Sequence, residues 1–168
     1  RIESFPKPVV AAVNGLAYGG GCEIVEAAHL AVAADGTAFA KPEIRLGMPP
    51  TFGGTQRLPR LAGRKRALEY LLTGEPFSAQ RALELGVINE VVPRAQLLPA
   101  ANRLAQRVAR HSAQAITAIL TSVTRGINAS IGEGLHIESE QFARLVPTRE
   151  LVSHLENWKS RRTRKASH

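Results

Sequence analysis

A glycine triplet and two glutamates are the residues of this chain whose types and spacing could carry out acid–base chemistry. Gly19-Gly20-Gly21 precedes a segment with a helical pattern that contains Glu23, and Glu43 follows Pro42 further along the chain. Glycines let a backbone approach a ligand closely, and the unpaired N–H groups of a first helical turn can stabilise a developing oxyanion. Two carboxylates across a substrate can activate water and transfer a proton.

Each of these features also has a purely structural explanation. The triplet could form a tight turn that lets a helix pack closely on a strand. Glu23 could complement the positive end of the helix dipole, and Glu43 could be an ordinary loop acid. The residues alone therefore leave both interpretations open.

Several other chemistries lack their motifs in this sequence. The glycine triplet has no third glycine at GxGxxG spacing, the only Gly-Arg-Lys stretch lacks the earlier glycine of a P-loop, and no GxSxG occurs. The five histidines are far apart, and Cys22 is the single cysteine, which excludes an intramolecular disulfide. We therefore expect neither a nucleotide or serine-hydrolase site nor a metal site.

Composition and charge set the class of protein. The 168 residues are 44% hydrophobic and 21% charged, which is typical of a globular domain. No apolar run reaches the roughly 18 residues needed to cross a bilayer, so we expect a soluble, cytoplasmic protein with no membrane partner. The net charge is +8, but residues 159–165 hold five of the basic side chains. A solvated end or a contact with anions, including nucleic acid, would both fit this segment.

The elements that must position these residues alternate between strand and helix. The patterns predict buried strands over 9–13, 30–34, 37–40 and 87–92, and short helices over 22–28, 55–61, 64–72 and 78–85. A strand–helix–strand order favours a parallel α/β arrangement. From residue 96 the pattern is helical, with a predicted interruption at Gly132-Glu133-Gly134 before helices over 135–145 and 148–161.

Several motifs, in order, resemble the enoyl-CoA hydratase/isomerase (crotonase) family over nearly all of the chain. They read KPVVAAVNG at 7–15, GGGCE at 19–23, KPEIRLG at 41–47, GGTQRL at 53–58, LTG at 72–74, SAQRAL at 78–83 and LGVINEVVP at 85–93. The resemblance implies an α/β fold of the ββα-spiral type. It also implies a partial spiral core with the active-site motifs over residues 1–93, and a helical trimerisation region over residues 94–168.

The resemblance also assigns roles to the glycine triplet and to the two glutamates. It implies that Gly20 donates its backbone N–H to the thioester oxygen, and that Gly19 and Gly20 contact the thioester and pantetheine region of an acyl-CoA. Glu23 is expected to orient and activate water, and Glu43 to exchange the proton on the acyl chain. These roles imply an enoyl-CoA hydratase of fatty-acid or related acyl-CoA metabolism, assembled as a homotrimer or a dimer of trimers. Coenzyme A would be part of the substrate, with no separate cofactor and no metal.

Departures from the family pattern keep other functions open. His29 stands where the family commonly has Asp, and we expect a packing or surface substitution rather than a new ligand. Pro49, Pro50, Thr51 and Phe52 replace the loop that lines the acyl end of the pocket. The family's usual N-terminal portion, which supplies a second oxyanion donor and much of the adenine pocket, has no counterpart in the sequence. The alternatives are therefore an enoyl-CoA isomerase or another crotonase-type reaction, a truncated and catalytically impaired paralogue, or an RNA-binding protein, with nucleic-acid binding ranked last.

Overall fold

Two small sheets form the first part of the chain in the computed structural model, which describes residues 1–166, with backbone only from 161. Strands β1 (Val10–Val13), β3 (Leu30–Ala34) and β6 (Glu90–Val92) pair in parallel in the order β1-β3-β6. Strand β4 (Ala38–Ala40) pairs in parallel with β2 (Leu16–Tyr18) and antiparallel with β5 (Phe77–Ser78). The predicted parallel α/β arrangement is confirmed.

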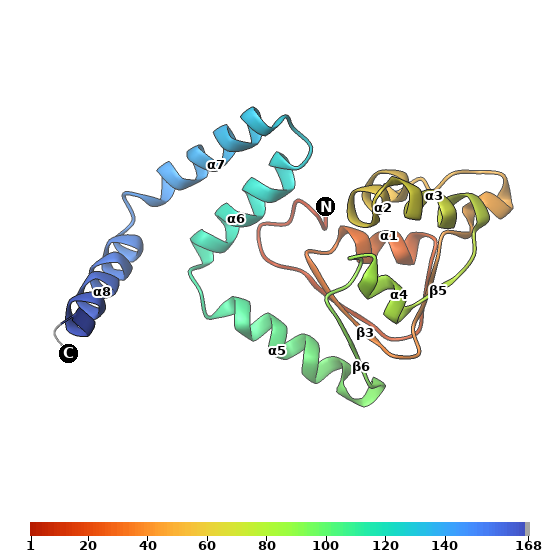
Figure 1. The fold of residues 1–168 in the computed structure, drawn as a ribbon, viewed down its shortest axis with the longest axis horizontal. Coiled ribbons are helices and arrows are strands. Elements are labelled where there is room, and N and C mark those ends of the chain that lie inside the picture. Colours follow the sequence, from red (N-terminus) through yellow and green to blue (C-terminus); the bar gives the residue numbers. More distant parts are fainter. Residues whose placement is uncertain (167–168) are drawn as a thin grey trace. The chain divides into compact units, whose positions relative to one another are not determined.

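Short helices connect and cover these strands (Figure 1). Their bounds are α1 (Gly20–Ala27), the 3₁₀ helix η1 (Pro42–Leu46), α2 (Gly54–Ala62), α3 (Arg64–Thr73), α4 (Ala79–Glu84) and the 3₁₀ helix η2 (Arg94–Gln96). Ser78 caps α4, because its hydroxyl accepts the Arg81 N–H. Strand β6 is shorter than predicted, and Val87 and Ile88 instead pack into the core before it begins.

Burial divides the apolar side chains of this part into two clusters. The larger one lies between the helices and the sheets and is built around Phe39, Leu58, Phe77 and Leu85. The ring of Phe39 stacks on that of Phe77 at 5.6 Å, which ties β4 to β5. The smaller one joins β3 and β6 to helix α5 (Leu97–Ala109).

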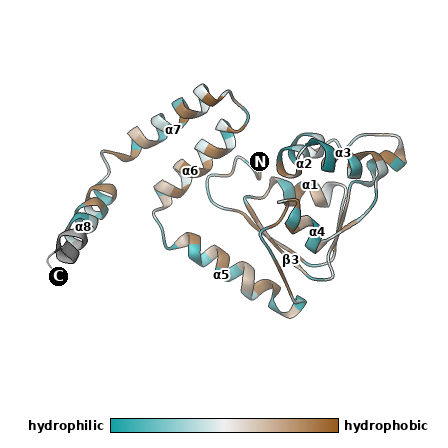
Figure 2. Ribbon diagram, viewed as in Figure 1, coloured by the Kyte–Doolittle hydropathy of each residue, from teal (hydrophilic) through white to brown (hydrophobic). Residues whose placement is uncertain are grey.

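The second part of the chain is helical, with α6 (Ala113–Gly126), α7 (Ile131–Leu145) and α8 (Arg149–Ala166). Residues 1–107 and 108–168 form two separate compact units. Figure 2 shows apolar residues along both α6 and α7. Among the helices of residues 1–166, none has the length and apolar character needed to cross a bilayer.

The predicted interruption at Gly132-Glu133-Gly134 is wrong, because these residues lie inside α7. The Ser130 hydroxyl accepts the Glu133 N–H, and the Glu133 carboxylate accepts the Ser130 N–H, which completes a capping box. Gly134 faces Gly126 of α6, and a Cβ on either residue would lie within 3.6 Å of the other backbone. These glycines therefore serve the close approach of two helices.

Candidate active site

Helix α1 begins at the glycine triplet, where the chain turns sharply after β2. Gly19 has φ 53° and ψ −122°, a conformation that side chains rarely adopt, and its N–H still donates to Ala40 O in the sheet. Gly20 is the first residue of the helix. Within the described part of the chain its N–H has no acceptor, so a donor is left available at the positive end of α1.

Glu23 lies one turn into α1 with 2% of its surface exposed. Its Oε1 accepts hydrogen bonds from the backbone N–H of Phe52 at 2.9 Å and of Gly54 at 2.7 Å. Its Oε2 is buried and has no hydrogen-bond partner among the described residues. One oxygen thus fixes the orientation of the carboxylate, and the other remains available to a ligand.

Glu43 approaches the glycine turn from the other side. Pro42 begins η1 and carries Glu43 into a buried position. The Glu43 Oε1 lies 3.0 Å from the point that a Cβ on Gly19 would occupy, so a side chain there would displace the carboxylate. The Glu43 Oε2 is also buried without a partner among residues 1–166. The structure therefore brings Glu43 next to the turn that precedes Glu23.

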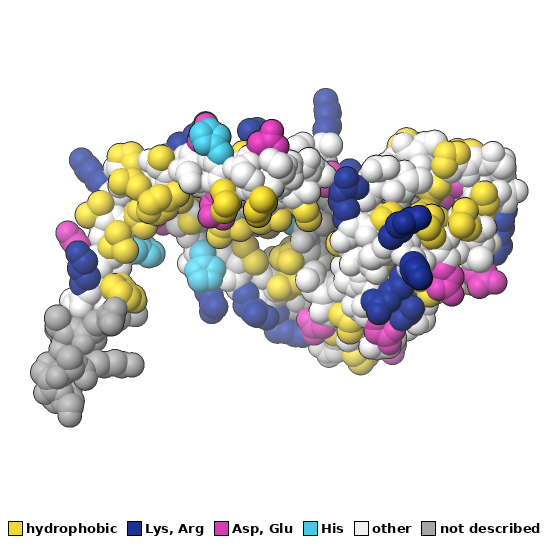
Figure 3. All heavy atoms as spheres, turned by 45° about the horizontal axis from the view of Figure 1, so that its top comes forward, with side chains coloured by type: hydrophobic (Ala, Val, Ile, Leu, Met, Phe, Trp, Pro, Cys, Tyr) yellow, Lys and Arg dark blue, Asp and Glu magenta, His cyan; other side chains and the backbone are white. Residues whose placement is uncertain are grey.

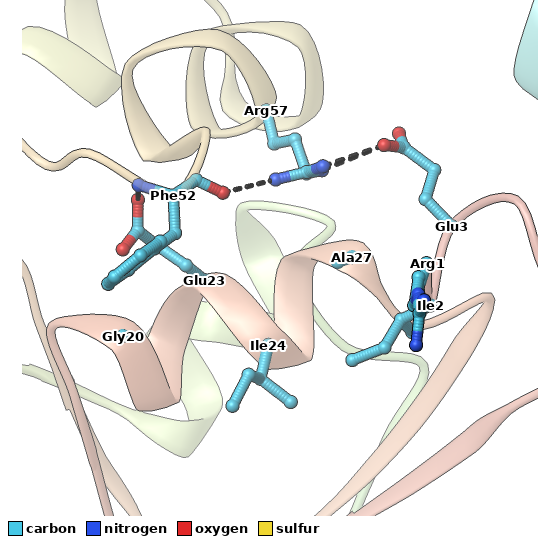
Figure 4. Close-up of a pocket in the computed structure, with 9 residues that line it drawn as sticks. All are labelled: Arg1, Ile2, Glu3, Gly20, Glu23, Ile24, Ala27, Phe52 and Arg57. Carbon is cyan, nitrogen blue, oxygen red and sulfur yellow. Dashed lines mark hydrogen bonds and ion pairs between the residues drawn. The ribbon is translucent and has the colours of Figure 1, made fainter.

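A cavity of about 450 Å³ opens beside α1 (Figure 4). Figure 4 shows Gly20 and Glu23 together with the ring of Phe52, which comes from the loop between η1 and α2. The lining is formed by Arg1, Ile2, Glu3, Gly20, Glu23, Ile24, Ala27, Phe52 and Arg57. Two of the predicted site residues, Gly20 and Glu23, contribute to this cavity, whereas Gly19 and Glu43 do not.

Arg57 of α2 holds the Phe52 loop in place. Its Nη1 donates to Phe52 O at 2.8 Å, and its Nε and Nη2 both donate to Glu3 Oε2. These hydrogen bonds to the Glu3 carboxylate raise the pKa of Arg57. Because the same loop donates two N–H groups to Glu23, Arg57 indirectly supports the orientation of that carboxylate.

A buried ion pair connects α1 with the residue that follows β4. Lys41 Nζ is 2.7 Å from Glu26 Oε1, and both side chains are fully buried. Burial raises the pKa of Glu26, and Lys41 opposes that rise. Cys22 donates weakly to the same Glu26 oxygen at 3.5 Å, and burial raises the pKa of its thiol.

Sequence reasoning missed Lys41, Glu26 and the N–H donors of Phe52 and Gly54. Lys41 and Gly54 stand inside two of the motifs, but one sequence gives no sign that a backbone amide 31 residues away meets Glu23. His29 is half-buried and contacts backbone groups. Its Nδ1 accepts the Val9 N–H, and its Nε2 lies 3.2 Å from Glu3 O. In the described residues no group of three or more His, Cys, Asp or Glu side chains is placed to hold a metal ion.

The arrangement combines an unpaired amide donor with two carboxylates that each keep a free, buried oxygen. Such a site can polarise a carbonyl oxygen through the Gly20 N–H while the carboxylates move protons nearby. Because the carboxylates lie in largely desolvated surroundings, their interaction with a bound molecule is stronger than it would be in water.

Comparison with known proteins finds relatives over most of the chain. A family model described as enoyl-CoA hydratase/isomerase matches residues 1–165. A short-chain-enoyl-CoA hydratase of Clostridium acetobutylicum is 38% identical over 148 residues, which cover 88% of this chain and 57% of that protein. A crotonyl-CoA hydratase of Syntrophomonas wolfei is 39% identical over 84% of this chain and 54% of its own length.

Solved structures show the same fold. A crystal structure of enoyl-CoA hydratase from Bacillus anthracis has a TM-score of 0.91 and 35% identity, and the match covers 95% of this chain and 62% of that one. An enoyl-CoA hydratase subunit from Geobacillus kaustophilus has a TM-score of 0.91 at 38% identity, with the same coverage. The predicted crotonase-like α/β fold is thus confirmed. The chain spans somewhat more than half of the length of these proteins.

Proposed function

The chain belongs to the enoyl-CoA hydratase/isomerase family, and we propose that it adds water to the double bond of a 2-enoyl-CoA thioester. The observation that carries the proposal is the pair of buried carboxylates, Glu23 and Glu43, on either side of the glycine turn. Each keeps one oxygen without a partner among the described residues. Two relatives, which are named as a short-chain-enoyl-CoA hydratase and a crotonyl-CoA hydratase, support the same reaction.

In the proposed reaction the Gly20 N–H donates to the thioester oxygen, where negative charge develops as water attacks. The Glu23 carboxylate takes a proton from water while the water oxygen bonds to C3 of the acyl chain. Glu43, which carries a proton at the start of the step, delivers it to C2 and is left as a carboxylate. Return of the proton from Glu23 to Glu43 then restores both groups, so the net change is the addition of one water molecule. Coenzyme A is part of the substrate, and these steps use only groups of the chain.

The presence of two acids favours hydration over isomerisation within this family. Moving a double bond requires one group that carries a proton between two carbons, whereas hydration also requires a group that handles water. Glu23 is held by two backbone amides with its second oxygen free, which suits the orientation of a water molecule.

The test uses the full chain with crotonyl-CoA. We expect loss of the enoyl-thioester absorbance and formation of the 3-hydroxyacyl product. Glu23→Gln and Glu43→Gln should each lower kcat by roughly a hundredfold or more, while Glu84→Gln, on the surface, should not. A folded chain with no turnover would favour the impaired-paralogue alternative, and double-bond migration without hydration would favour the isomerase.

The same proposal includes self-association through the helical unit. Figure 3 shows apolar side chains gathered over this part of the molecule. Several are more than half exposed, namely Ile119, Val123, Ile127, Ile131, Leu135, Phe142 and Trp158. A group of apolar side chains that is this exposed is typical of a protein–protein interface. We therefore propose that residues 108–168 assemble the chain into a homotrimer or a dimer of trimers.

Sedimentation velocity tests this assembly. Ile131 is 82% exposed, so Ile131→Lys should leave the helix folded and shift the chain toward smaller species. Glu140→Gln makes the same change in charge on the opposite side of α7 and should leave the assembly unchanged. If the unaltered chain sediments as a monomer at micromolar concentration, the assembly proposal fails.

The location that we propose is cytoplasmic. Cys22 is a free, buried thiol, and a lone unpaired cysteine is usual in a reducing compartment.

A further inference from the structure

Phe52 places an exposed aromatic ring at the cavity of the candidate active site. It lines this cavity together with Gly20 and Glu23 of α1. Figure 4 shows the ring beside the Glu23 side chain, turned toward the start of the helix. Because 74% of the Phe52 surface is exposed, the ring contributes little to the apolar core, and its removal should leave the fold intact.

The backbone of Phe52 is fixed at both of its polar groups. Its N–H donates to Glu23 Oε1 at 2.9 Å, and its C=O accepts Arg57 Nη1 at 2.8 Å. Two residues further on, the Gly54 N–H donates to the same Glu23 oxygen at 2.7 Å. These three hydrogen bonds hold the loop against α1 and α2, so the loop cannot move back from the cavity without releasing Glu23.

The ring faces the side of Gly20 on which a side chain would project. Its Cδ2 and Cε2 atoms lie 3.7 and 3.8 Å from the point that a Cβ on Gly20 would occupy. The proposed reaction puts the thioester oxygen at the Gly20 N–H and the attacked carbon C3 near Glu23. The ring therefore stands beside the place from which the acyl chain continues beyond C3.

The room in this cavity is limited. Its volume of about 450 Å³ is in the lower half of the range of roughly 300–1,000 Å³ that is usual for small-molecule sites. The thioester and the reacting carbons must fit before any further part of an acyl chain does. Each additional methylene then competes with the ring for space, and one methylene in an apolar pocket changes discrimination by about tenfold or more.

We propose that the Phe52 side chain is a specificity-determining group that limits the acyl chain of the substrate to a few carbons beyond C3. The inference rests on the hydration reaction proposed above, which defines where the thioester and C3 lie. Phe52 then has two separate roles, since its backbone orients Glu23 and its ring selects the length of the acyl chain. A change of side chain keeps the backbone N–H and C=O, and with them the hydrogen bonds to Glu23 and Arg57.

The experiment is a series of variants in which only the size of this side chain changes. Phe52→Ala, Phe52→Leu and Phe52→Trp are assayed in the full chain with crotonyl-CoA and with trans-2-octenoyl-CoA. The kcat/KM for octenoyl-CoA relative to that for crotonyl-CoA should rise at least tenfold in Phe52→Ala, rise less in Phe52→Leu and fall in Phe52→Trp. Phe5→Ala is the matched control, because Phe5 is half exposed and does not line the cavity, and it should leave this ratio unchanged.

Binding provides a second readout that does not depend on turnover. Butyryl-CoA and octanoyl-CoA have saturated acyl chains and cannot be hydrated, so isothermal titration calorimetry gives their Kd values directly. The Kd for octanoyl-CoA relative to that for butyryl-CoA should fall at least tenfold in Phe52→Ala. An unchanged ratio in all variants would overturn the inference. A higher ratio in Phe52→Ala would also overturn it, because the ring would then bind a long chain instead of limiting it.

The two proposals fail separately in this experiment. Ratios of Kd that follow the size of the side chain, in a chain that does not hydrate crotonyl-CoA, would support the role of Phe52 and contradict the proposed reaction. Hydration of crotonyl-CoA with the same chain-length ratio in every variant would do the reverse. If neither saturated acyl-CoA binds to the unaltered chain or to any variant, both proposals fail.

Discussion

Glu23 depends on a hydrogen bond from a backbone N–H at a position that only glycine can occupy. Gly54 donates its N–H to Glu23 Oε1 at 2.7 Å. A Cβ on Gly54 would lie 2.8 Å from Lys41 Nζ, 3.0 Å from Glu23 Oε1 and 3.0 Å from Pro50 Cβ. Distances this short require something to move, so the glycine is needed for space.

We therefore predict that Gly54→Ala displaces the Glu23 carboxylate. Overpacking at such a position should cost about 2 kcal/mol of unfolding free energy, measured by urea denaturation, and should lower kcat. Gly21→Ala is the matched control, because a Cβ there meets nothing within 4 Å and alanine favours the helix. Equal stability of the two variants would contradict the steric argument.

Cys22 provides a second prediction at the residue scale. Its side chain is fully buried, and burial raises the pKa of the thiol above its ordinary value of 9.0. Because the thiolate is the reactive form, we expect a thiol-specific reagent at pH 8 to modify the folded chain far more slowly than the urea-unfolded chain. Fast modification of the folded chain would show that the interior behind α1 opens readily.

Among the elements, α7 is the helix whose start the sequence predicts wrongly. Its glycines look like an interruption, but the Ser130–Glu133 capping box starts the helix before them. Gly134 then allows α7 to approach Gly126 of α6. The glycines of a helix–helix contact cannot be told from those of a loop until the partner helix is known.

The capping box carries the prediction for this element. Ser130→Ala removes the side chain that accepts the Glu133 N–H and should cost about 1 kcal/mol, measured as a lower melting temperature with reduced helical circular dichroism. Ser139→Ala, in the same helix but away from its start, should have a smaller effect. An unchanged melting temperature in Ser130→Ala would mean that α7 does not depend on its cap.

Glu133 gives the same helix a pH dependence. The Ser130 backbone N–H lowers the pKa of Glu133 below its ordinary value of 4.5. A carboxyl whose pKa is lowered by folding contributes stability above its ordinary pKa, and this contribution is lost as the pH falls through the lowered value. Glu133→Gln should therefore reduce the difference in melting temperature between pH 6 and pH 3. If this difference in melting temperature is unchanged, the capping box does not cause the pH dependence of stability.

For the whole molecule, the two compact units and the uneven charge matter most. The sequence predicts a spiral core over residues 1–93 and a trimerisation region over residues 94–168, and this division of roles stays a prediction. The compact units of the structure are residues 1–107 and 108–168. The contact with anions that the sequence analysis allows for the basic C-terminal segment falls mainly on residues 161–165, whose side chains lie outside the described residues. The proposed reaction therefore rests on the first unit alone.

The net charge of the whole chain leads to a further prediction. Deletion of residues 159–168 lowers the net charge from +8 to +3, so the shortened chain should elute from heparin at lower salt. Retention that survives the deletion would point instead to the basic side chains of α2 and α3, and would strengthen the nucleic-acid alternative.

The sequence by itself determined the family, the parallel α/β pattern and the three residues proposed for the chemistry. These follow from short-range features, namely apolar runs, glycines before a helix and ordered motifs. It did not reveal the three-residue strand β2 or the two-residue strand β5. Both strands are defined by pairing with β4, whose residues are distant from them in the sequence.

Only the tertiary structure decided what surrounds Glu23. The Gly54 amide, the Lys41 ammonium and the Glu26 carboxylate come together from separate elements. Hydrogen bonding and charge compensation in a buried site depend on distances between such elements, and no spacing along a single chain encodes those distances. The sequence supplied the residues that could react, and the fold decided which neighbours surround them.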